Sequence, residues 1–431
     1  MKVVKLLLVV VLSAHITITC AQAVITNVGT LPESVSNNAV CAGKIQQIPY
    51  LFSFAGIDST KKYNGIHLRS FRYNLTTGKS ERIPDLPDTL GKIACGVSCI
   101  GGIAFISGGY HVFANGNEKS SNKMHRYDII NNSFLSDGPN IPIATDDHVQ
   151  AVWRDSLIFL ITGWSDNSNI PNVQIYNPTS NQWQTGTSVP NNNAYKSFGA
   201  SGVIVKDTIF YFGGASSGTG FKIQSWLRRG IINPNNPAEI TWSFSSPNPS
   251  AVIYRGASIV VKQQAHWVGG SANTYNYNGI AYDGSGGVAP SNKEYTWTGS
   301  KWDIKITQNI PMDLRGIAVL NDTIAYVAGG MASDQRVSSA IYKLYWGDKN
   351  AQNRTLAKPT FQVYPNPFKN YILTKNTTAL GHIEVFNSVG QPVSVIIDAK
   401  HRVSTKHLPS GFYHVIWNDE TGSYIRQMIK L

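Results

Sequence analysis

The sequence predicts an all-β protein whose main domain is a β-propeller of six blades. Short runs rich in Val, Ile, Tyr, Phe and Trp recur along the chain with polar turns between them, as in β-hairpins. An apolar run that ends in a small-residue turn appears six times, at intervals of roughly 50 to 60 residues. These turns end at Gly56, Gly109, Gly163, Gly214, Gly270 and Gly330. Six such units of short strands indicate sheets packed radially around an axis.

A Pro-bearing turn precedes each of the six runs, and an aromatic pair follows three of them. The prolines are Pro32, Pro87, Pro142, Pro190, Pro249 and Pro311. The pairs place an aromatic residue seven positions after a Tyr: Tyr127 with Phe134, Tyr176 with Trp183, and Tyr295 with Trp302. This pattern resembles the kelch repeat, which is marked by a Gly doublet, a downstream Tyr and a later Trp. The resemblance implies a kelch-type β-propeller over residues 24–358. The fourth unit fits least well, because a long insertion separates Trp226 from Trp242.

Small residues gather where the innermost strand of most units should lie, as a narrow axis requires. They are Ala39, Ala94-Cys95-Gly96, Gly199-Ala200-Ser201-Gly202, Gly256-Ala257-Ser258 and Gly316-Ile317-Ala318. The last unit ends after Tyr342 without an aromatic pair. Val24–Val28 precedes the first Pro-bearing turn, which is where every other unit has its outermost strand. The sequence therefore predicts that this N-terminal strand completes blade six and hides an exposed strand edge.

Residues 1–23 have the layout of a secretory signal. A short basic segment precedes the apolar run Leu6–Leu12, and Ala21-Gln22-Ala23 is a small-residue cleavage site. A lipid anchor at Cys20 is disfavoured, because the residues before it are not the Leu and small residues that lipid attachment requires. No later stretch approaches the roughly 18 consecutive apolar residues of a transmembrane helix, so no such segment is expected.

The C-terminal residues form a second recognisable segment. Its blocks are Tyr364-Pro365-Asn366-Pro367, Ile383–Gln391, Leu408–Tyr413 and Tyr424–Lys430. These blocks resemble the type A sorting domain of the type IX secretion system. The resemblance implies a small Ig-like β-sandwich over residues 359–431 that is recognised by the secretion machinery. It also implies a product that passes through the periplasm and is secreted or displayed on the outer cell surface. The residues that match the sorting signal are Tyr364, Pro365, Asn366, Pro367, Gly390, Gly411 and Tyr413.

Three cysteines remain after the signal, an odd number for an exported chain. Cys95 and Cys99 lie on one expected strand, about 13 Å apart in extended geometry, which is too far for a bridge. Cys41 and Cys95 occupy similar places on the innermost strands of adjacent blades and form the better pair. The alternative is that all three are small buried residues that fill space near the axis.

The predicted mouth of the channel carries charged residues. Counting four to six residues past each turn Pro reaches the start of each innermost strand, and places Lys92, Asp147, His148, Lys196, Arg255 and Arg315 there. The loops that rise around the mouth are expected to carry further residues, namely Tyr110, His111, Trp164, Asp166, Tyr275 and Tyr277. A ring of cations with aromatic walls would suit an anionic ligand, such as a uronate or sialate sugar. The alternative is that the arginines tie adjacent blades together through buried hydrogen bonds.

Two functions are compatible with these features. The first is a binding module that holds a glycan or a protein partner on the propeller face. The second is a metal-free enzyme, similar to the kelch-type epimerase that interconverts sialic acid anomers, with Asp147 and His148 as its acid–base pair.

Other functional classes find no support in the residue pattern. No spacing is typical of a zinc site or a phosphate-binding loop, and no Cys, Tyr and His set resembles that of the kelch-type copper oxidases. No metal or cofactor is therefore expected. The formal net charge is +12, and no run of Arg and Lys accompanies it, so a nucleic-acid partner is not expected.

Overall fold

The computed structural model describes residues 22–347, 362–375, 382–397, 402–419 and 422–431. The chain divides into two compact units, residues 1–347 and residues 348–431. Most of the expected signal segment and the expected domain boundary at residue 358 lie outside the described residues. None of the helices within those ranges is long and apolar enough to cross a membrane.

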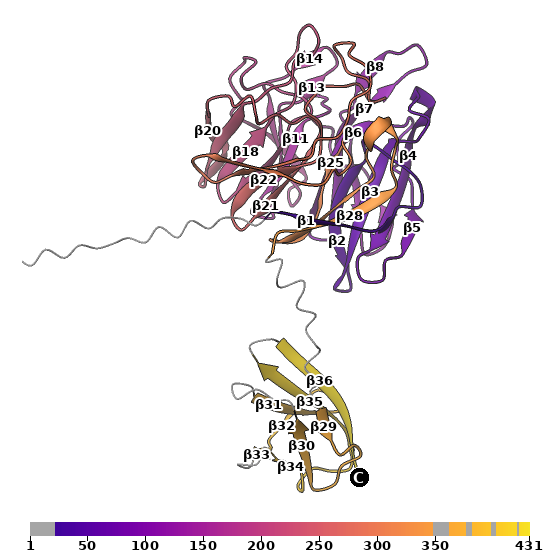
Figure 1. Ribbon diagram of the computed structural model, residues 1–431, viewed down its shortest axis with the longest axis vertical. Coiled ribbons are helices and arrows are strands. Elements are labelled where there is room, and N and C mark those ends of the chain that lie inside the picture. The colour runs from indigo at the N-terminus through magenta and orange to yellow at the C-terminus, as the bar shows by residue number, and fades with distance from the viewer. Residues whose placement is uncertain (1–21, 348–361, 376–381, 398–401, 420–421) are drawn as a thin grey trace, which may run out of the picture. The chain divides into compact units, whose positions relative to one another are not determined.

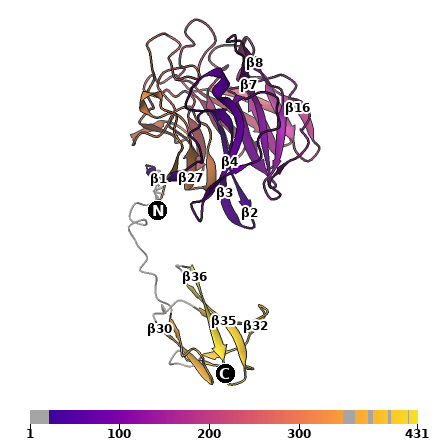
Figure 2. The same ribbon diagram turned by 90° about the vertical axis from the view of Figure 1, so that its right-hand side faces the viewer.

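The described part of the first unit forms a propeller with six blades, each built around four antiparallel strands (Figure 1). Blades one to three contain β2 (Ala39–Ile45), β3 (Ile48–Ile57), β4 (Ile66–Asn74) and β5 (Ser80–Ile83); β6 (Ile93–Ile100), β7 (Ile103–Val112), β9 (Met124–Asp128) and β10 (Ser133–Phe134); and β11 (Val149–Trp153), β12 (Leu157–Ile161), β15 (Val173–Asn177) and β16 (Gln182–Gly186). Blades four and five contain β17 (Ser201–Val205), β18 (Thr208–Phe212), β19 (Leu227–Asn233) and β20 (Asn236–Phe244); and β21 (Ala257–Val261), β22 (Gln264–Val268), β23 (Lys293–Trp297) and β24 (Trp302–Ile306). Figure 2 shows β2, β3 and β4 of blade one side by side.

Blade six closes the ring with strands from both ends of the unit. It contains β26 (Ala318–Asn321), β27 (Ile324–Ala328), β28 (Ala340–Tyr345) and β1 (Val24–Thr30). β1 pairs antiparallel with β28, from Val24 opposite Tyr345 to Thr30 opposite Ala340. The predicted closure by the N-terminal strand is therefore confirmed. A short strand, β25 (Arg315–Gly316), adds a parallel pairing with β2 and so joins blade six to blade one.

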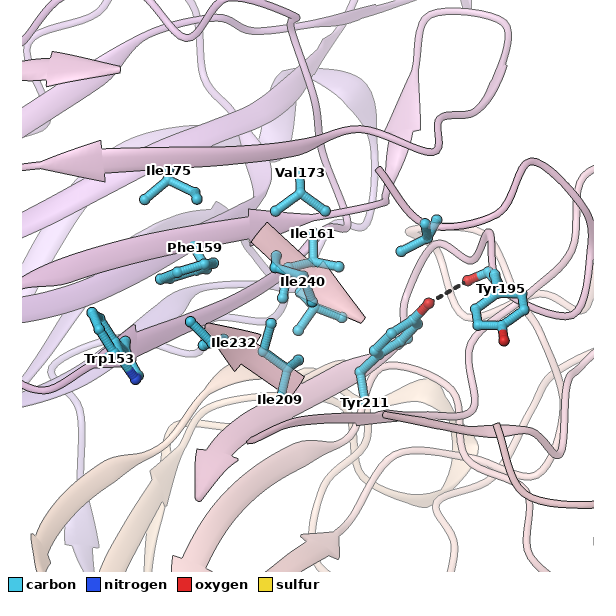
Figure 3. Packing of buried hydrophobic residues seen from close by; sticks show 13 residues of the cluster. Trp153, Phe159, Ile161, Val173, Ile175, Tyr195, Ile209, Tyr211, Ile232 and Ile240 are labelled. Atoms are coloured by element: carbon cyan, nitrogen blue, oxygen red, sulfur yellow. Dashed lines mark hydrogen bonds between the residues drawn. The ribbon is translucent and has the colours of Figure 1, made fainter. Parts of the chain in front are cut away.

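Adjacent blades pack through continuous apolar clusters, such as the one between blades three and four in Figure 3. Phe159 and Ile175 of blade three lie in this cluster together with Ile209 and Tyr211 of blade four. The Tyr211 hydroxyl is fully buried and donates a hydrogen bond to the carbonyl oxygen of Tyr195 at 2.8 Å. Blade four, despite its insertion, is therefore a complete blade.

The aromatic pairs of the repeat are neighbours across the two outer strands. Tyr176 lies directly opposite Trp183, with ring centroids 5.1 Å apart, and Tyr127 lies opposite Phe134 at 5.0 Å. In the longer outer hairpin of blade four, Gly230 lies opposite Trp242, and the Trp242 ring contacts Tyr211 of β18 instead, with ring centroids 6.0 Å apart.

The second unit contains two four-stranded sheets among its described residues. One sheet has the order β29 (Gln362–Tyr364), β30 (Tyr371–Lys375), β34 (Arg402–Ser404), β33 (Ile396–Ile397); the other has the order β32 (Pro392–Val393), β31 (His382–Asn387), β35 (Gly411–Asp419), β36 (Gly422–Lys430). Phe368, Val403 and Val415 belong to the apolar core of this unit. The Tyr413 hydroxyl of the sorting signal donates to the carbonyl oxygen of Pro409 at 2.9 Å. Gly390 adopts a φ of 80°, which favours glycine, in the turn after β31.

Candidate ligand-binding site

One residue from each blade forms a closed collar where the innermost strands begin. These collar residues are Asn37, Ala94, Asp147, Gly199, Arg255 and Asp313, and all six have a left-handed backbone with φ between 47° and 67°. The N–H groups of Asp147, Gly199 and Arg255 each donate to the carbonyl oxygen of the preceding collar residue, at 3.2, 2.9 and 2.8 Å. The N–H of Leu314 donates to Arg255, and that of Asn37 donates to Asp313. The Asn37 side-chain oxygen accepts from Ala94 and completes the circuit.

Arg255 ties three blades together at this collar. Its guanidinium contacts both Asp147 carboxylate oxygens, with Nη2–Oδ2 at 2.6 Å and Nε–Oδ1 at 3.1 Å, and reaches Asp313 Oδ1 at 3.2 Å. Arg315 adds a 3.4 Å contact to Asp147 and donates to the carbonyl oxygen of His148. All three side chains of the Asp147, Arg255 and Asp313 bridge are at most 2% exposed.

The structure does not assemble the expected ring of open cations at the mouth. Lys92 is fully buried, where its Nζ lies 2.5 Å from Asp88 and 3.0 Å from the Ser121 hydroxyl. Arg255 is buried in the collar, and Lys196 is only half-buried and does not line the cavity described below. The charged residues were predicted at the correct ends of the strands, but the left-handed backbone of the collar turns Asp147 and Arg255 inward. The alternative expectation, arginines that tie the blades together, describes Arg255 and Arg315.

A cavity of about 210 Å³ lies above the collar, and we name it the acidic cup. Its lining residues are Tyr110, Glu118, Asp146, Asp147, Trp164, Phe198, Phe221, Arg255, Asn276 and Tyr282. Tyr110, Asp147, Trp164 and Arg255 were among the residues predicted at the mouth. The other lining residues were missed, because many of them lie on the long connections between the second and third strands of the blades, where the repeat has no fixed pattern. The length of those connections was the feature of the sequence that could have pointed to these residues.

The walls of the acidic cup are aromatic. Trp164, on the small hairpin of β13 (Trp164–Ser165) and β14 (Ser168–Asn169), lies edge-on to Phe198 at 5.3 Å and to Phe221 at 5.5 Å. Phe221 in turn contacts Tyr282, with ring centroids 4.7 Å apart. Edge-to-face contacts of this kind hold large rings in fixed positions. Trp164, Phe221 and Tyr282 all remain partly exposed, so they offer ring surface to a ligand.

The polar side of the cup consists mainly of carboxyl groups. Asp146 is 3% exposed, and its Oδ2 accepts a hydrogen bond from the Ser120 hydroxyl at 2.6 Å. Burial, and then the charge of Asp147, raise the pKa of Asp146 well above its usual value, because both disfavour the charged form of its carboxyl group. Glu118, on β8 (Glu118–Ser120), is an exposed residue, yet desolvation of its carboxyl group raises its pKa as well. Because Asp147 is already paired with arginine, the cup offers hydrogen-bonding groups rather than a free positive charge.

Asp166, another charged residue expected on this face, supports the loops around the cup. The Asp166 carboxylate lies 2.8 Å from Lys119 Nζ and accepts a hydrogen bond from the N–H of Ser120 at 2.9 Å. The N–H of Asp166 donates to the Ser120 hydroxyl, which itself contacts Asp146. Asp166 therefore fastens the hairpin that carries Trp164 to the strand that carries Glu118.

Asp147 and His148 do not form the expected acid–base pair, because they face different cavities. His148 lines the central channel, where its Nε2 lies 3.1 Å from the Ser107 hydroxyl oxygen and 3.2 Å from Gln150 Oε1. Burial, followed by the charge of Arg315, lowers the pKa of His148 to about 3. The imidazole is therefore neutral at physiological pH and belongs to the packing around the channel.

Replacing His148 with Gln is expected to flatten the dependence of stability on pH. A histidine whose folded pKa lies below its unfolded pKa of about 6.5 contributes stability that is present above pH 6.5 and is lost as the pH falls toward 3. Between pH 7 and pH 5, the free energy of unfolding of the wild type should thus fall by about 2 kcal/mol more than that of the variant. Urea unfolding at both pH values measures this, and equal losses would contradict the assignment of a neutral, buried imidazole.

The central channel below the collar has a volume of about 530 Å³. Its lining includes Gly96, Ala200, Ser201, Gly202, Gly256, Ala257, Ser258 and Gly316, as the small-residue pattern predicted. Among the described residues, no group of three or more His, Cys, Asp or Glu side chains is arranged to hold a metal ion.

Cys41 and Cys95 belong to one apolar cluster near the axis, but Cys41 does not pair with Cys95. Cys41 Sγ lies 2.7 Å from Cys99 Sγ, whereas Cys95 Sγ lies 3.4 Å from the carbonyl oxygen of Gly108. All three thiols are free in the structure. Positions counted from the turn prolines aligned Cys41 with Cys95, but the collar aligns Asn37 with Ala94, so Cys41 lies level with Ser98 and Cys99.

Comparisons with known proteins agree with this architecture. Residues 362–431 match the family described as the secretion system C-terminal sorting domain. Kelch-like protein 36 from Mus musculus and from Rattus norvegicus is 25% identical over 118 residues, which is 27% of this chain and 18% of those proteins. The chain therefore spans less than a fifth of the length of the curated relatives that it matches.

Two solved structures share the fold. The structure of YjhT aligns with a TM-score of 0.58 at 14% identity, covering 73% of this chain and 96% of that one. A fungal alcohol oxidase of the AA5 family in complex with copper aligns with a TM-score of 0.50 at 12% identity, covering 96% of this chain and all of that one. At these identities the likeness concerns the fold alone. The chain combines a six-bladed β-propeller with a C-terminal type IX sorting domain, which marks it for export to the cell surface or the medium.

Proposed function

We propose that the propeller is a binding module that holds a neutral sugar ring in the acidic cup. The observation that carries this proposal is the combination of partly exposed aromatic walls with buried carboxyl groups in one small cavity. Sugar rings present apolar C–H faces and a rim of hydroxyl groups. Aromatic rings cover the former, while carboxyl oxygens accept hydrogen bonds from the latter.

The charge of the cup favours a neutral ligand over the anionic one expected from the sequence. Three carboxyl groups line the cavity, and the single lining arginine, Arg255, is engaged by Asp147 and Asp313. An anionic sugar would thus face carboxylates without a free cation among the described lining residues. The volume of about 210 Å³ also lies below the roughly 300–1,000 Å³ of sites for drug-sized ligands. It suits one sugar unit, such as the end of a glycan, rather than a protein surface.

Removing the indole of Trp164 tests this function. In the Trp164→Ala variant, binding of a neutral glycan is expected to weaken at least tenfold, because a stacked indole contributes on the order of 1.4 kcal/mol or more. Tyr63→Ala is the matched control, since Tyr63 is 44% exposed and lies on the β3–β4 connection outside the cup lining. Titration calorimetry on both purified variants measures their affinities for the glycan. Equal affinities of the two variants would place the ligand outside the cup.

A second function, sugar isomerisation, is favoured by one feature of the same cup. Burial raises the pKa values of both Asp146 and Glu118, and carboxyl groups with shifted pKa values in a cavity are typical of sites that transfer protons. An enzyme of this kind would accelerate the exchange of sugar anomers, measurable by NMR, and Glu118→Gln would abolish the acceleration. Binding without acceleration by the wild type would leave the binding module as the function.

A further inference from the structure

We propose that Cys41 and Cys99 form a disulfide bond that links blades one and two in the exported protein. The two sulfur atoms lie 2.7 Å apart, one on β2 and the other on β6. Even two carbon atoms, which are smaller than sulfur, make their best non-bonded contact at about 3.5–4.0 Å. A disulfide bond requires about 2.05 Å, so a movement of less than about 1 Å brings the two sulfur atoms to bonding distance.

The surroundings of the two thiols allow an oxidant to reach them. Both residues line the central channel of about 530 Å³. Cys41 is 6% exposed, whereas Cys99 is partly exposed. Cys95, by contrast, is 1% exposed and is absent from the channel lining. The pair therefore differs from the third thiol both in its proximity and in its access to solvent.

The chemistry requires an oxidant of the protein-disulfide class, such as a periplasmic thiol oxidoreductase. The thiolate of Cys99 attacks one sulfur of that disulfide, and a mixed disulfide forms as the other sulfur leaves as a thiolate. The sulfur of Cys41 then attacks Cys99, which forms the Cys41–Cys99 bond and releases the second thiolate. Two S–H bonds are broken and one S–S bond is formed, while the oxidant gains two electrons and two protons. The sorting domain sends this chain through an oxidising compartment, where disulfides persist.

The bond would act by stabilising the propeller, independently of any ligand. It would close a loop between positions that lie 58 residues apart, which restricts the unfolded chain. Reduction, or the replacement Cys99→Ala, is expected to lower the Tm of the protein by on the order of 5 °C. The Cys95→Ala variant is the matched control, and its Tm should still respond to reductant.

The deciding experiment is a peptide map of the secreted wild-type protein, denatured and treated with iodoacetamide without reductant. We expect a linked peptide pair that contains Cys41 and Cys99, two hydrogens lighter than the free thiols, with Cys95 alkylated. The Cys95→Ala variant should keep the link, and Cys99→Ala should lose it and expose Cys41 to alkylation. Three alkylated thiols in the wild type, or a link between Cys41 and Cys95, would overturn the proposal. The wild-type map alone decides if a variant is not exported.

Discussion

Replacing Arg255 with Leu is expected to lower the free energy of unfolding of the propeller by about 3–5 kcal/mol, because it leaves buried carboxylates without their partner. Asp147 and Asp313 are at most 2% exposed, and Arg255 is the cation that joins them. Asp147 would keep only the 3.4 Å contact to Arg315, and Asp313 would keep its hydrogen bonds from Ser36 and Asn37. Since these residues come from different blades, the loss should weaken the closed ring rather than one sheet.

Urea unfolding of Arg255→Leu and of a surface control measures this effect. Arg154→Leu is the matched control, because Arg154 forms a 2.9 Å ion pair with Asp207 but is 52% exposed. An exposed pair of this kind contributes about 1 kcal/mol at most. Equal midpoints for the two variants would show that the buried bridge does not hold the collar together.

Deleting residues 22–30 is expected to prevent the propeller from folding into a stable closed ring. The deletion removes β1, so the whole edge of β28 from Ala340 to Tyr345 becomes unpaired. It also removes the backbone acceptors for the Tyr73 hydroxyl and the Gln308 side chain, which bind the carbonyl oxygens of Val28 and Ile25. The free energy of unfolding should fall by at least about 5 kcal/mol, since several hydrogen bonds worth about 1 kcal/mol each are lost together with apolar packing.

An open strand edge also favours association between copies of the chain. Size-exclusion chromatography and thermal unfolding of a chain that begins at Leu31 should therefore show aggregates and a broad, early transition. A chain that begins at Gln22 retains β1 and is the control. If both chains elute as monomers with the same Tm, blade six does not depend on β1.

The propeller could be predicted from the sequence because the same pattern of turns and short strands recurs in each blade. The absence of an aromatic pair after Tyr342 and the surplus strand at Val24 together predicted the closure of blade six. The insertion before Trp242 obscured blade four because its outer hairpin is longer and places Gly230 opposite Trp242, whose ring instead contacts Tyr211 of β18. Spacing from the turn prolines located the collar residues Asp147 and Arg255, but chose Lys196 where the collar residue is Gly199.

The site was harder to predict, because it depends on backbone turns and on contacts between blades. Asp147 and Arg255 have positive φ values without being glycines, and the residues next to them in the sequence give no indication that their side chains turn inward. Phe221 and Tyr282 lie on connections that carry no repeat, so only the assembled fold brings them to Trp164. The same limit applied to Cys41, whose partner depends on how the innermost strands of two blades are aligned.

A glycan-array screen of the mature protein at low and high salt tests the acidic cup most directly. The array should present neutral and acidic glycans side by side, with the Trp164→Ala variant screened in parallel. We predict binding to neutral glycans that is unchanged by salt and is lost in the variant, because aromatic stacking and hydrogen bonds to hydroxyl groups carry it. Salt-sensitive binding confined to acidic glycans, or neutral binding that persists in Trp164→Ala, would contradict the assignment of the cup as a neutral sugar site.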